Sequence, residues 1–227
     1  MNSSPTFWPQ GTVFGTLLNS RTELQALGER VTQPPYKAAP RAPVLYIKTA
    51  NTWSASGTAI PVPSHVPRVE VGASVAMVMG PPRSGHRGAA AATSVAGFVL
   101  LNDLGVPHDS FFRPPVRFKC LDGFLGVGPV CVPAAQSGDP AALVVEVRIN
   151  GNVRQTVCFD DMVRDAATLL QDVHGFMTLR AGDLLMLGCG AGRPLAGVGD
   201  RIEISVPGRA AFGTLSNTLV AAPGEVA

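Results

Sequence analysis

The chain has 227 residues, of which 46% are hydrophobic and only 15% are charged, with a formal net charge of +2. Its 25 glycines and 20 prolines favour a turn-rich, strand-dominated globule over a helical bundle. The small, evenly spread charge excludes a typical nucleic-acid-binding surface. No apolar run approaches the roughly 20 residues that span a bilayer, and the first ten residues lack a secretion signal. We expect a cytoplasmic protein without nucleic-acid or membrane partners.

The first half of the chain is predicted to contain mostly strands, which follow a flexible lead-in over residues 1–11. Apolar, β-branched runs predict strands, and Ser20 is placed to cap a short helix. The Ser-, Thr-, Gly- and Pro-rich stretch after the second strand is expected to be a loop with one short strand near Ala59. In chain order, the expected elements are the strand Thr12–Asn19, the helix Thr22–Arg30, the strand Val44–Lys48, the loop Thr49–Val66 and the strand Val69–Met79.

The middle of the chain is less regular. Pro81–Gly88 is a basic turn, and the alanine run Gly88–Thr93 suits a short helix. Val95–Leu101 favours a strand, although propensity does not fix the boundary between the two. The following proline-containing segment, FFRPPVRFKCLDGFLGVGP, is expected to be extended and rich in turns.

The second half carries the clearest local pattern, two valine-rich arms around Asn150-Gly151, which predict a hairpin with a type I′ turn. A helix is expected over Met162–His174, with Asp160 or Asp161 as N-cap and Gly175 after its end. Three strands follow, and no interior linker is long enough to separate two domains. We therefore expect one domain over residues 12–227. The hairpin arms are Leu143–Asn150 and Val153–Phe159, and the last strands are Leu184–Leu187, Ile202–Val206 and Gly213–Leu219.

Asp103 is the most informative polar position, because it directly follows an apolar strand. A lone carboxylate there binds a divalent cation only weakly, since Mg²⁺ needs further oxygen ligands; the alternative is that Asp103 caps a turn. Arg113, Lys119 and Asp122 form a charged cluster further on. Lysine can neutralise charge that develops on a bound 2-oxo or enol acid, whereas the alternative is a surface ion pair worth at most about 1 kcal/mol. Lys48, at the end of its strand, has the same two interpretations.

The cysteines and glycines offer weaker signals. The four cysteines show no C-x-x-C spacing and are expected to be reduced, small buried hydrophobes. A glycine-rich turn over Gly188, Cys189 and Gly190 follows a strand, but it lacks the Gly-Lys-Ser/Thr ending of a P-loop. A nucleophilic Cys189 would need a positioned base, and only His174 is near in sequence. The histidines show no zinc-ligand spacing.

Several of these segments together resemble the fumarylacetoacetate hydrolase family. The segments that carry the resemblance are VLYIKTANT, VAGFVLLND, FFRPPVRFKCLDGFLGVGP and FMTLRAGDLLMLG, and the similarity extends from about Thr12 to Val220. It implies an α+β, strand-dominated fold, namely the mixed β-sandwich roll of that family's C-terminal domain, with a few short helices.

The resemblance also implies a site. Enzymes of this family hold a divalent metal with three carboxylates, two of them in a Glu-x-Glu strand. Asp103 matches one ligand, whereas Gly72 and Ser74 stand where the glutamates would be, so Mg²⁺ or Mn²⁺ is implied by the family but is either bound weakly or absent here. The implied catalytic residues are Lys119, Arg113 and Asp122, and the implied substrate contacts are Lys48, Gly188, Cys189 and Gly190.

Within the family, the sequence most resembles the first, N-terminal half of the isomerase/decarboxylases of 4-hydroxyphenylacetate (homoprotocatechuate) breakdown, which have two homologous halves. This implies decarboxylation of 5-oxopent-3-ene-1,2,5-tricarboxylate or isomerisation of 5-carboxymethyl-2-hydroxymuconate, with a small polycarboxylate as substrate. The chain would be an enzyme subunit, or else a catalytically degenerate partner of an active homologue. Either interpretation implies a homo-oligomer or a hetero-oligomer with a homologous subunit.

Overall fold

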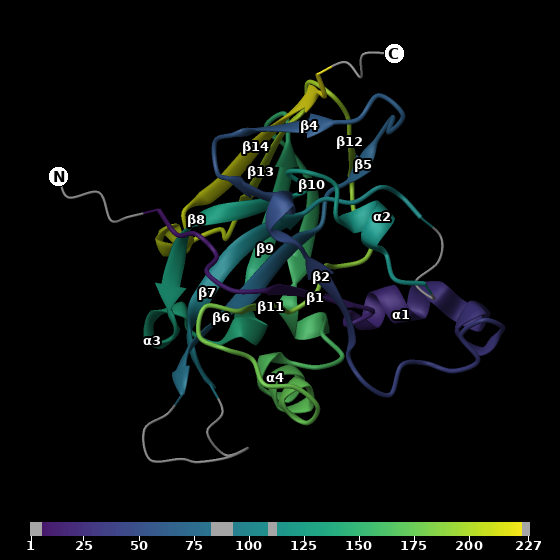
Figure 1. The fold of residues 1–227 in the computed structure, drawn as a ribbon, viewed down its shortest axis with the longest axis vertical. Helices are drawn as coiled ribbons and strands as arrows, with labels where there is room; N and C mark the ends of the chain where they lie inside the picture. The colour runs from purple at the N-terminus through teal and green to yellow at the C-terminus, as the bar shows by residue number, and fades with distance from the viewer. Residues whose placement is uncertain (1–5, 83–92, 109–112, 224–227) are drawn as a thin grey trace.

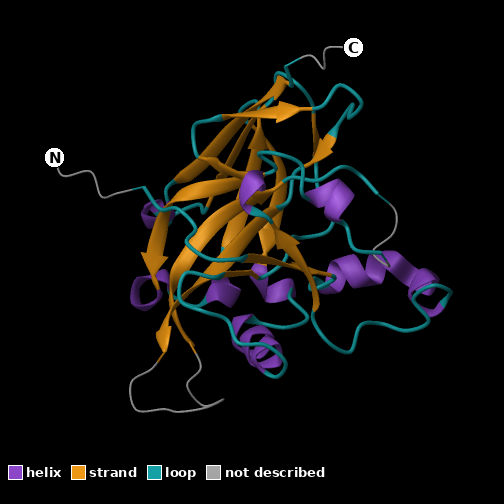
Figure 2. Ribbon diagram, in the orientation of Figure 1, coloured by secondary structure: helices purple, strands orange, loops and turns teal. Residues whose placement is uncertain are grey.

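The protein is described here by a computed structural model that covers residues 6–82, 93–108 and 113–223. Two packed β-sheets form most of it, and the helices lie around their outside (Figures 1 and 2). The larger sheet has the strand order β2-β1-β11-β6-β7-β8-β3, the smaller has β10-β9-β13-β14-β4, and β12 pairs with β5. Most neighbours are antiparallel, but β1 with β11, β3 with β8 and β14 with β4 are parallel. This arrangement confirms the expected strand-dominated fold with mixed sheets and few helices.

The bounds of the elements are as follows. The strands of the larger sheet are β1 (Val13–Leu17), β2 (Val44–Lys48), β3 (Trp53–Ala55), β6 (Ala73–Pro82), β7 (Thr93–Asp103), β8 (Leu125–Pro133) and β11 (Leu184–Met186). The remaining strands are β4 (Ala59–Val62), β5 (Val69–Glu70), β9 (Val144–Ile149), β10 (Asn152–Cys158), β12 (Leu195–Ala196), β13 (Arg201–Ser205) and β14 (Thr214–Ala221). The helices are α1 (Arg21–Leu27), α2 (Val116–Lys119), α3 (Ala134–Ser137) and α4 (Ala166–His174), and short 3-10 turns link several elements.

The main core lies between the two sheets, where Met77 and Leu100 from the larger sheet join Val147 and Ile204 from the smaller. The opposite face of the larger sheet buries a second apolar cluster that includes Ala76, Val99 and Leu101. Strands β6 and β7 are therefore covered on both faces, which explains their nearly continuous apolar sequences. A polar side chain at the end of β7 is consequently buried away from solvent.

Several local predictions are confirmed. Strand β2 has the expected bounds, and the Ser20 side chain accepts a hydrogen bond from the Glu23 N–H at the start of α1. The β9–β10 hairpin turns at Asn150 and Gly151, whose φ angles of 53° and 78° are those of a type I′ turn.

Other boundaries were predicted wrongly. The expected strand Val69–Met79 is divided into β5 and β6 at Gly72, and β3 and β8 were not predicted. Helix α4 starts at Ala166 with Asp165 as its N-cap, because Met162 forms a β-bridge with Ser20 and the Asp161 carboxylate accepts hydrogen bonds from Ser20 and Thr22.

Two further details differ from expectation. Gly175 keeps right-handed helical angles at the end of α4, φ −65° and ψ −21°, where a left-handed residue was expected. The segment expected to be extended contains the helical turn α2, which begins after Pro115. The basic turn is described only at Pro81 and Pro82, and the alanine-run helix, apart from Thr93, lies outside the described residues.

The lead-in is partly anchored: the Phe7 N–H donates to the Pro129 carbonyl, and Trp8 packs edge-on against Trp53. Within the described ranges, none of the helices has the length and apolar character required to cross a membrane.

Candidate active site

The candidate site is built around Asp103, the last residue of β7, with Lys48 from the end of β2 and Lys119 from the end of α2. The strand period of two places Asp103 on the same face as Leu101, within the second apolar cluster. The side chains of Asp103 and Lys48 are 0% exposed and that of Lys119 is 1% exposed. Three distant segments thus bring three charged groups together out of contact with water.

The two carboxylate oxygens of Asp103 each face an ammonium group. Oδ1 lies 2.8 Å from Lys48 Nζ and Oδ2 lies 2.7 Å from Lys119 Nζ. The Tyr46 hydroxyl also donates to Oδ2, at 2.5 Å. Oδ1 accepts no directed hydrogen bond, because Lys48 donates to the carbonyls of Leu104, Lys119 and Phe124. The contact between Asp103 Oδ1 and Lys48 is therefore an ion pair without a hydrogen bond.

Burial and pairing set the protonation states of this cluster. Burial alone would raise the pKa of Asp103, but the ammonium groups of Lys119 and Lys48 outweigh it and hold the pKa well below its usual range. Burial lowers the pKa of Lys48, and the Asp103 charge only partly opposes this. Burial, followed by the Asp103 charge, raises the pKa of Tyr46 well above 10. Asp103 is ionised and Tyr46 is neutral near pH 7, so Tyr46 acts as a hydrogen-bond donor.

Gly72 lies next to Asp103, and Ser74 lies two residues further along the neighbouring strand. The Asp103 N–H donates to the Gly72 carbonyl, and Ser74 pairs with Leu101 in the β6–β7 register. Both residues therefore share the face that presents Asp103. The Ser74 hydroxyl donates to the Gly188 carbonyl at 2.8 Å. That these positions replace two glutamates stays a prediction, but their side chains supply no charge to the site.

The residues present do not fit a Mg²⁺ or Mn²⁺ ion. Among the described residues there is no group of three His, Cys, Asp or Glu side chains that could hold a metal. Asp103 directs both oxygens at ammonium groups, and a dication between them would meet two positive charges at contact distance. Hard dications favour several oxygen ligands, and only one carboxylate is available here.

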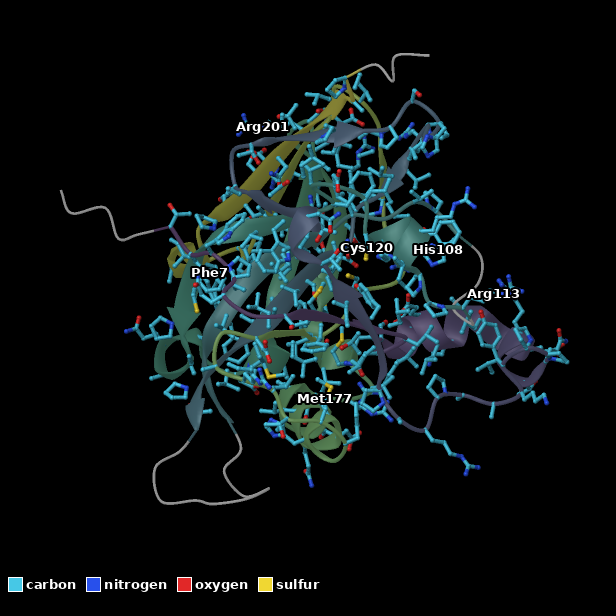
Figure 3. All side chains as sticks on the ribbon, in the orientation of Figure 1. Phe7, His108, Arg113, Cys120, Met177 and Arg201 are labelled. Carbon is cyan, nitrogen blue, oxygen red and sulfur yellow. The ribbon has the colours of Figure 1, made fainter. Side chains whose placement is uncertain are left out.

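A cavity of about 510 Å³ lies between β2 and α2 and reaches Lys119 and Tyr46. Most of its lining is apolar, and Arg113 lies in its wall on the exposed side. Figure 3 places Arg113 near the edge of the molecule and Cys120, which also lines the cavity, nearer its centre. Lys119 and Arg113 thus both line one cavity, most of whose other lining residues are apolar.

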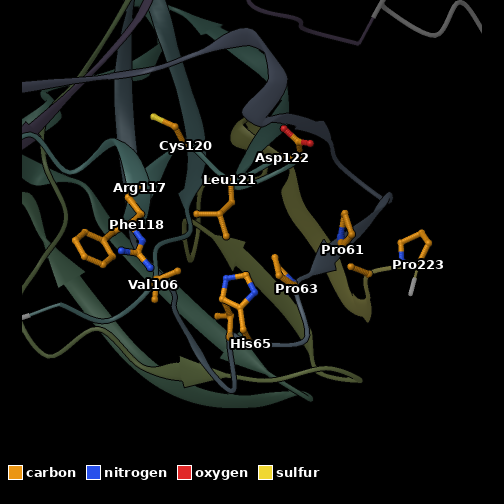
Figure 4. Close-up of a pocket in the computed structure, with 12 residues that line it drawn as sticks. Pro61, Pro63, His65, Val106, Arg117, Phe118, Cys120, Leu121, Asp122 and Pro223 are labelled. Carbon is orange, nitrogen blue, oxygen red and sulfur yellow. The ribbon is translucent and has the colours of Figure 1, made fainter. Parts of the chain in front are cut away.

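Asp122 does not join them. It is exposed, accepts a hydrogen bond from Asn51 Nδ2 at 2.6 Å, and lines a different cavity of about 660 Å³. Figure 4 shows this second cavity, with Arg117 and Phe118 on one side, Pro61 and Pro223 on the other, and His65 beside Pro63. The structure therefore separates Asp122 from the Lys119 side of α2.

The glycine-rich turn contacts Asp103 but does not line the cavity between β2 and α2. Cys189 Sγ lies 4.0 Å from Asp103 Oδ2, and burial followed by the Asp103 charge raises the Cys189 pKa to about 12. A thiol with this pKa is not a nucleophile. Gly188 has a φ of 109° and Gly190 packs against Val157. All four cysteines are free, as expected, but only Cys189 is buried, so the expectation that all are buried was wrong.

Sequence reasoning missed Tyr46 and a second ion-pair group. Tyr46 is two residues before Lys48, so the alternation of β2 already placed both on one face. Arg193 lies 3.0 Å from Glu23 and 3.6 Å from Glu70 and is largely buried. Nothing in its sequence context signals this, because the three residues come from segments far apart in the chain.

Comparison with known proteins assigns the class. Residues 12–220 match the family described as fumarylacetoacetate (FAA) hydrolase C-terminal. The chain therefore belongs to the fumarylacetoacetate hydrolase family.

Its relatives include isomerase/decarboxylases. The chain is 38% identical over 212 residues to the 4-hydroxyphenylacetate degradation bifunctional isomerase/decarboxylase of Salmonella dublin, a match that covers 93% of this chain and 48% of that protein. The chain spans about half the length of these curated relatives.

Solved structures share the fold at lower identity. One is the 5-carboxymethyl-2-hydroxymuconate delta-isomerase from Mycobacterium smegmatis, with a TM-score of 0.71, 24% identity, and coverage of 94% of this chain and 80% of that one. Another is fumarylpyruvate hydrolase from Pseudomonas aeruginosa in complex with Mn²⁺ and pyruvate, with a TM-score of 0.75, 20% identity, and coverage of 97% and 94%.

Proposed function

We propose that the chain is a subunit of an isomerase/decarboxylase of 4-hydroxyphenylacetate catabolism that acts on a 2-oxo or enol polycarboxylate. The observation that carries this proposal is the 38% identity to the Salmonella dublin enzyme over 93% of the chain. The activity would be that of a 5-oxopent-3-ene-1,2,5-tricarboxylate decarboxylase or a 5-carboxymethyl-2-hydroxymuconate isomerase. Residues 12–227 would form one domain of this enzyme.

The chemistry of both reactions needs positive charge near a developing enolate. In decarboxylation the bond to the carboxyl carbon breaks, its electron pair enters the adjacent carbonyl system, CO₂ leaves, and a proton then adds to carbon. In isomerisation one carbon loses a proton, the electron pair shifts, and another carbon gains a proton. The apolar cavity between β2 and α2, with Lys119 at one side and Arg113 in its wall, suits an unsaturated chain that carries carboxylates.

Lys119 would stabilise the enolate charge, and Arg113 would bind a second carboxylate of the substrate. A preorganised cation in a site with little water stabilises such charge far better than it would in bulk water. Lys48 would act indirectly, because its ammonium is enclosed by protein oxygens. Asp122, on the other cavity, is left without a role in this arrangement.

A second candidate function is a catalytically degenerate partner subunit, and a specific observation favours it. Gly72 and Ser74 supply no carboxylate, and both oxygens of Asp103 face lysine ammonium groups. If chemistry in this enzyme depends on a metal held by three carboxylates, it would take place in a homologous subunit. The chain would then form an interface, with itself or with that homologue.

Activity measured with and without a homologous subunit tests both proposals. The homologue should carry two glutamates in the strand that matches β6, and substrate loss and CO₂ release should be followed for each chain alone and for the mixture. Turnover by this chain alone supports the enzyme subunit, and Lys119→Met should then reduce kcat/KM by about 10²–10³-fold, with Lys37→Met as the exposed control. Increased turnover or co-migration only in the mixture supports the partner subunit. No turnover and no association in any combination refutes both.

A further inference from the structure

Two asparagine side chains that the proposed chemistry does not use lie close together in the main core. Asn102 precedes Asp103 in β7 and is 0% exposed, and Asn217 of β14 is 1% exposed. Because residues two apart on a strand share a face, Asn102 lies on the face of Leu100 and Asn217 on that of Leu215, both in the core between the two sheets. Asn102 therefore points away from the face that presents Asp103.

Gly126 of β8 shows how close the two amides are. It pairs with Asn102 in the β7–β8 register. A Cβ at Gly126 would lie 2.2 Å from Asn217 Oδ1 and 3.1 Å from Asn102 Cβ. The separation between Asn217 Oδ1 and Asn102 Cβ therefore cannot exceed the sum of these two distances. A side chain at this position would displace the Asn217 amide, so the glycine leaves the space that both asparagines occupy.

Three polar atoms of this pair lack a partner. The orientation of the Asn217 amide is fixed, because its Nδ2 donates to the carbonyls of Ala55 at 3.0 Å and Thr58 at 3.1 Å. Its Oδ1 accepts no hydrogen bond from the described residues, and within the same part of the chain neither Oδ1 nor Nδ2 of Asn102 has a partner. Buried amides are nearly always hydrogen-bonded, and an unmet one destabilises the fold. These atoms therefore require a ligand.

Water suits the three atoms better than an ion does. A water molecule donates and accepts, so it can bond to an N–H group and an amide oxygen at once. Buried waters typically make roughly two to four hydrogen bonds to polar groups that have no protein partner. A cation would meet the Asn102 N–H group, and an anion would meet the two amide oxygens. Either charge would also be costly among the apolar side chains of the main core.

We propose that a buried water molecule binds between Asn102 and Asn217 and links the larger sheet to the smaller one. The water donates to Asn217 Oδ1 and bonds to the Asn102 amide, either orientation of which presents an atom without a protein partner. It stabilises the end of β7 against β14, one residue before Asp103. The inference concerns the core alone, so it holds whether the chain is catalytic or a partner subunit.

Two measurements on the full wild-type chain test the site. A crystal structure that resolves ordered solvent should show a water within hydrogen-bond distance of Asn217 Oδ1 and of the Asn102 amide. In solution, NMR should show an Overhauser contact between water and the Nδ2 protons of Asn102. Asn19 is the matched control: it is also buried, but its Nδ2 donates to the carbonyls of Arg164 and Leu187, so it should show no such contact.

The pair of variants Asn102→Ser and Asn102→Ala tests the same site through stability. Both side chains are smaller than asparagine, so neither crowds the core, and they differ by one hydroxyl group. If the site holds water, the serine hydroxyl can bond to it, and the serine variant should have a Tm about 1–6 °C above that of the alanine variant. In a dry site the serine hydroxyl would be unmet, and the order of the two Tm values would be reversed.

Either of two results would overturn the proposal. One is a wild-type structure in which the two amides bond directly or have no solvent density between them, together with no water contact at Asn102 by NMR. The other is a serine variant that melts below the alanine variant. The wild-type measurements decide if neither variant folds. Failure of the proposed enzymatic activity would leave all of these measurements unaffected.

Discussion

Asp103→Asn is the most informative single substitution, because it removes the only negative charge from a buried group of three. The side-chain charges of Asp103, Lys48 and Lys119 sum to +1, and the asparagine variant raises the sum to +2. At an effective dielectric constant of about 20, each contact near 2.8 Å contributes roughly 6 kcal/mol of gross attraction. Much of this only offsets the desolvation of the charges. Measured losses on removing one partner of a buried pair are about 3–5 kcal/mol.

We therefore expect Asp103→Asn to lower the free energy of unfolding by about 3–5 kcal/mol, a large part of the usual 5–15 kcal/mol. Lys119→Met should cost less, about 1–3 kcal/mol, because it leaves Asp103 and Lys48 as a neutral pair. Urea unfolding followed by the fluorescence of Trp8 and Trp53, at one fixed protein concentration, measures both. The double variant Asp103→Asn/Lys119→Met should lose less free energy of unfolding than the sum of the two single losses. Asp103→Asn leaves two unpaired ammonium groups, whereas the double variant leaves only that of Lys48.

The pH dependence gives an independent check. The pKa of Asp103 is depressed in the folded state from its ordinary value of 3.8, so its stabilisation is complete above pH 3.8 and is lost as pH falls toward the folded-state pKa. In that window the free energy of unfolding of wild type should therefore fall more steeply with decreasing pH than that of Asp103→Asn, which lacks the titrating carboxylate. The difference in slope should be up to about 1.4 kcal/mol per pH unit. The reasoning is refuted if Asp103→Asn unfolds within 1 kcal/mol of wild type, or if Lys119→Met is the more damaging change.

Three further outcomes are expected. Iodoacetamide at pH 8 should modify the exposed Cys158 at least about 100-fold faster than the buried Cys189, whose pKa is raised to about 12; mass spectrometry of the native protein measures this, and equal rates would contradict the burial of Cys189. Gly151→Ala should lower the free energy of unfolding by about 1–2 kcal/mol, because Gly151 has a φ of 78°, which alanine adopts only with strain. No atom lies near the added Cβ, so the loss would come from the backbone alone. Gly197→Ala is the control: Gly197 has no positive φ, and urea unfolding should show almost no loss. Gly72→Glu combined with Ser74→Glu should not create a Mg²⁺ site detectable by calorimetry while Lys48 and Lys119 remain; binding at micromolar affinity would show that the lysines do not block it.

The parts of the fold that the sequence predicts correctly are those fixed by local periodicity and turn chemistry. Strand β2 and the Asn150-Gly151 hairpin depend on alternation and on residues that tolerate positive φ, and both are confirmed. The start of α4 was predicted four residues too early, because Met162 continues the helical pattern but pairs with Ser20 instead. A contact between segments more than a hundred residues apart has no local signal, so tertiary pairing decides such boundaries.

The candidate site was likewise predicted only in part from the sequence. Family motifs directed attention to Asp103, Lys119 and Lys48, and the structure brings these three together. The motifs could not show that the lysines bind the carboxylate itself, because that depends on how β2, β7 and α2 converge. Asp122 was grouped with Lys119 because it lies three residues further on in the same segment that resembles the family. The turn after α2 directs it to the other cavity, and a three-residue separation outside a helix carries no information on direction.

The lack of carboxylates at Gly72 and Ser74 changes the balance of charge around Asp103, because Lys48 and Lys119 then face a single carboxylate. Three carboxylates and a dication sum to −1, and three carboxylates with two ammonium groups also sum to −1. A chain with both glutamates and both lysines would therefore carry −1 without a metal and +1 with a dication, and +1 is also the sum of Asp103, Lys48 and Lys119 here. Space at Gly72 is also limited, because a Cβ there would lie 2.6 Å from the Asp103 carbonyl oxygen and 2.9 Å from Cys189 Sγ. A side chain at Gly72 would therefore require the end of β7 or Cys189 to shift, and Lys48 and Lys119 together already carry more charge than the single carboxylate.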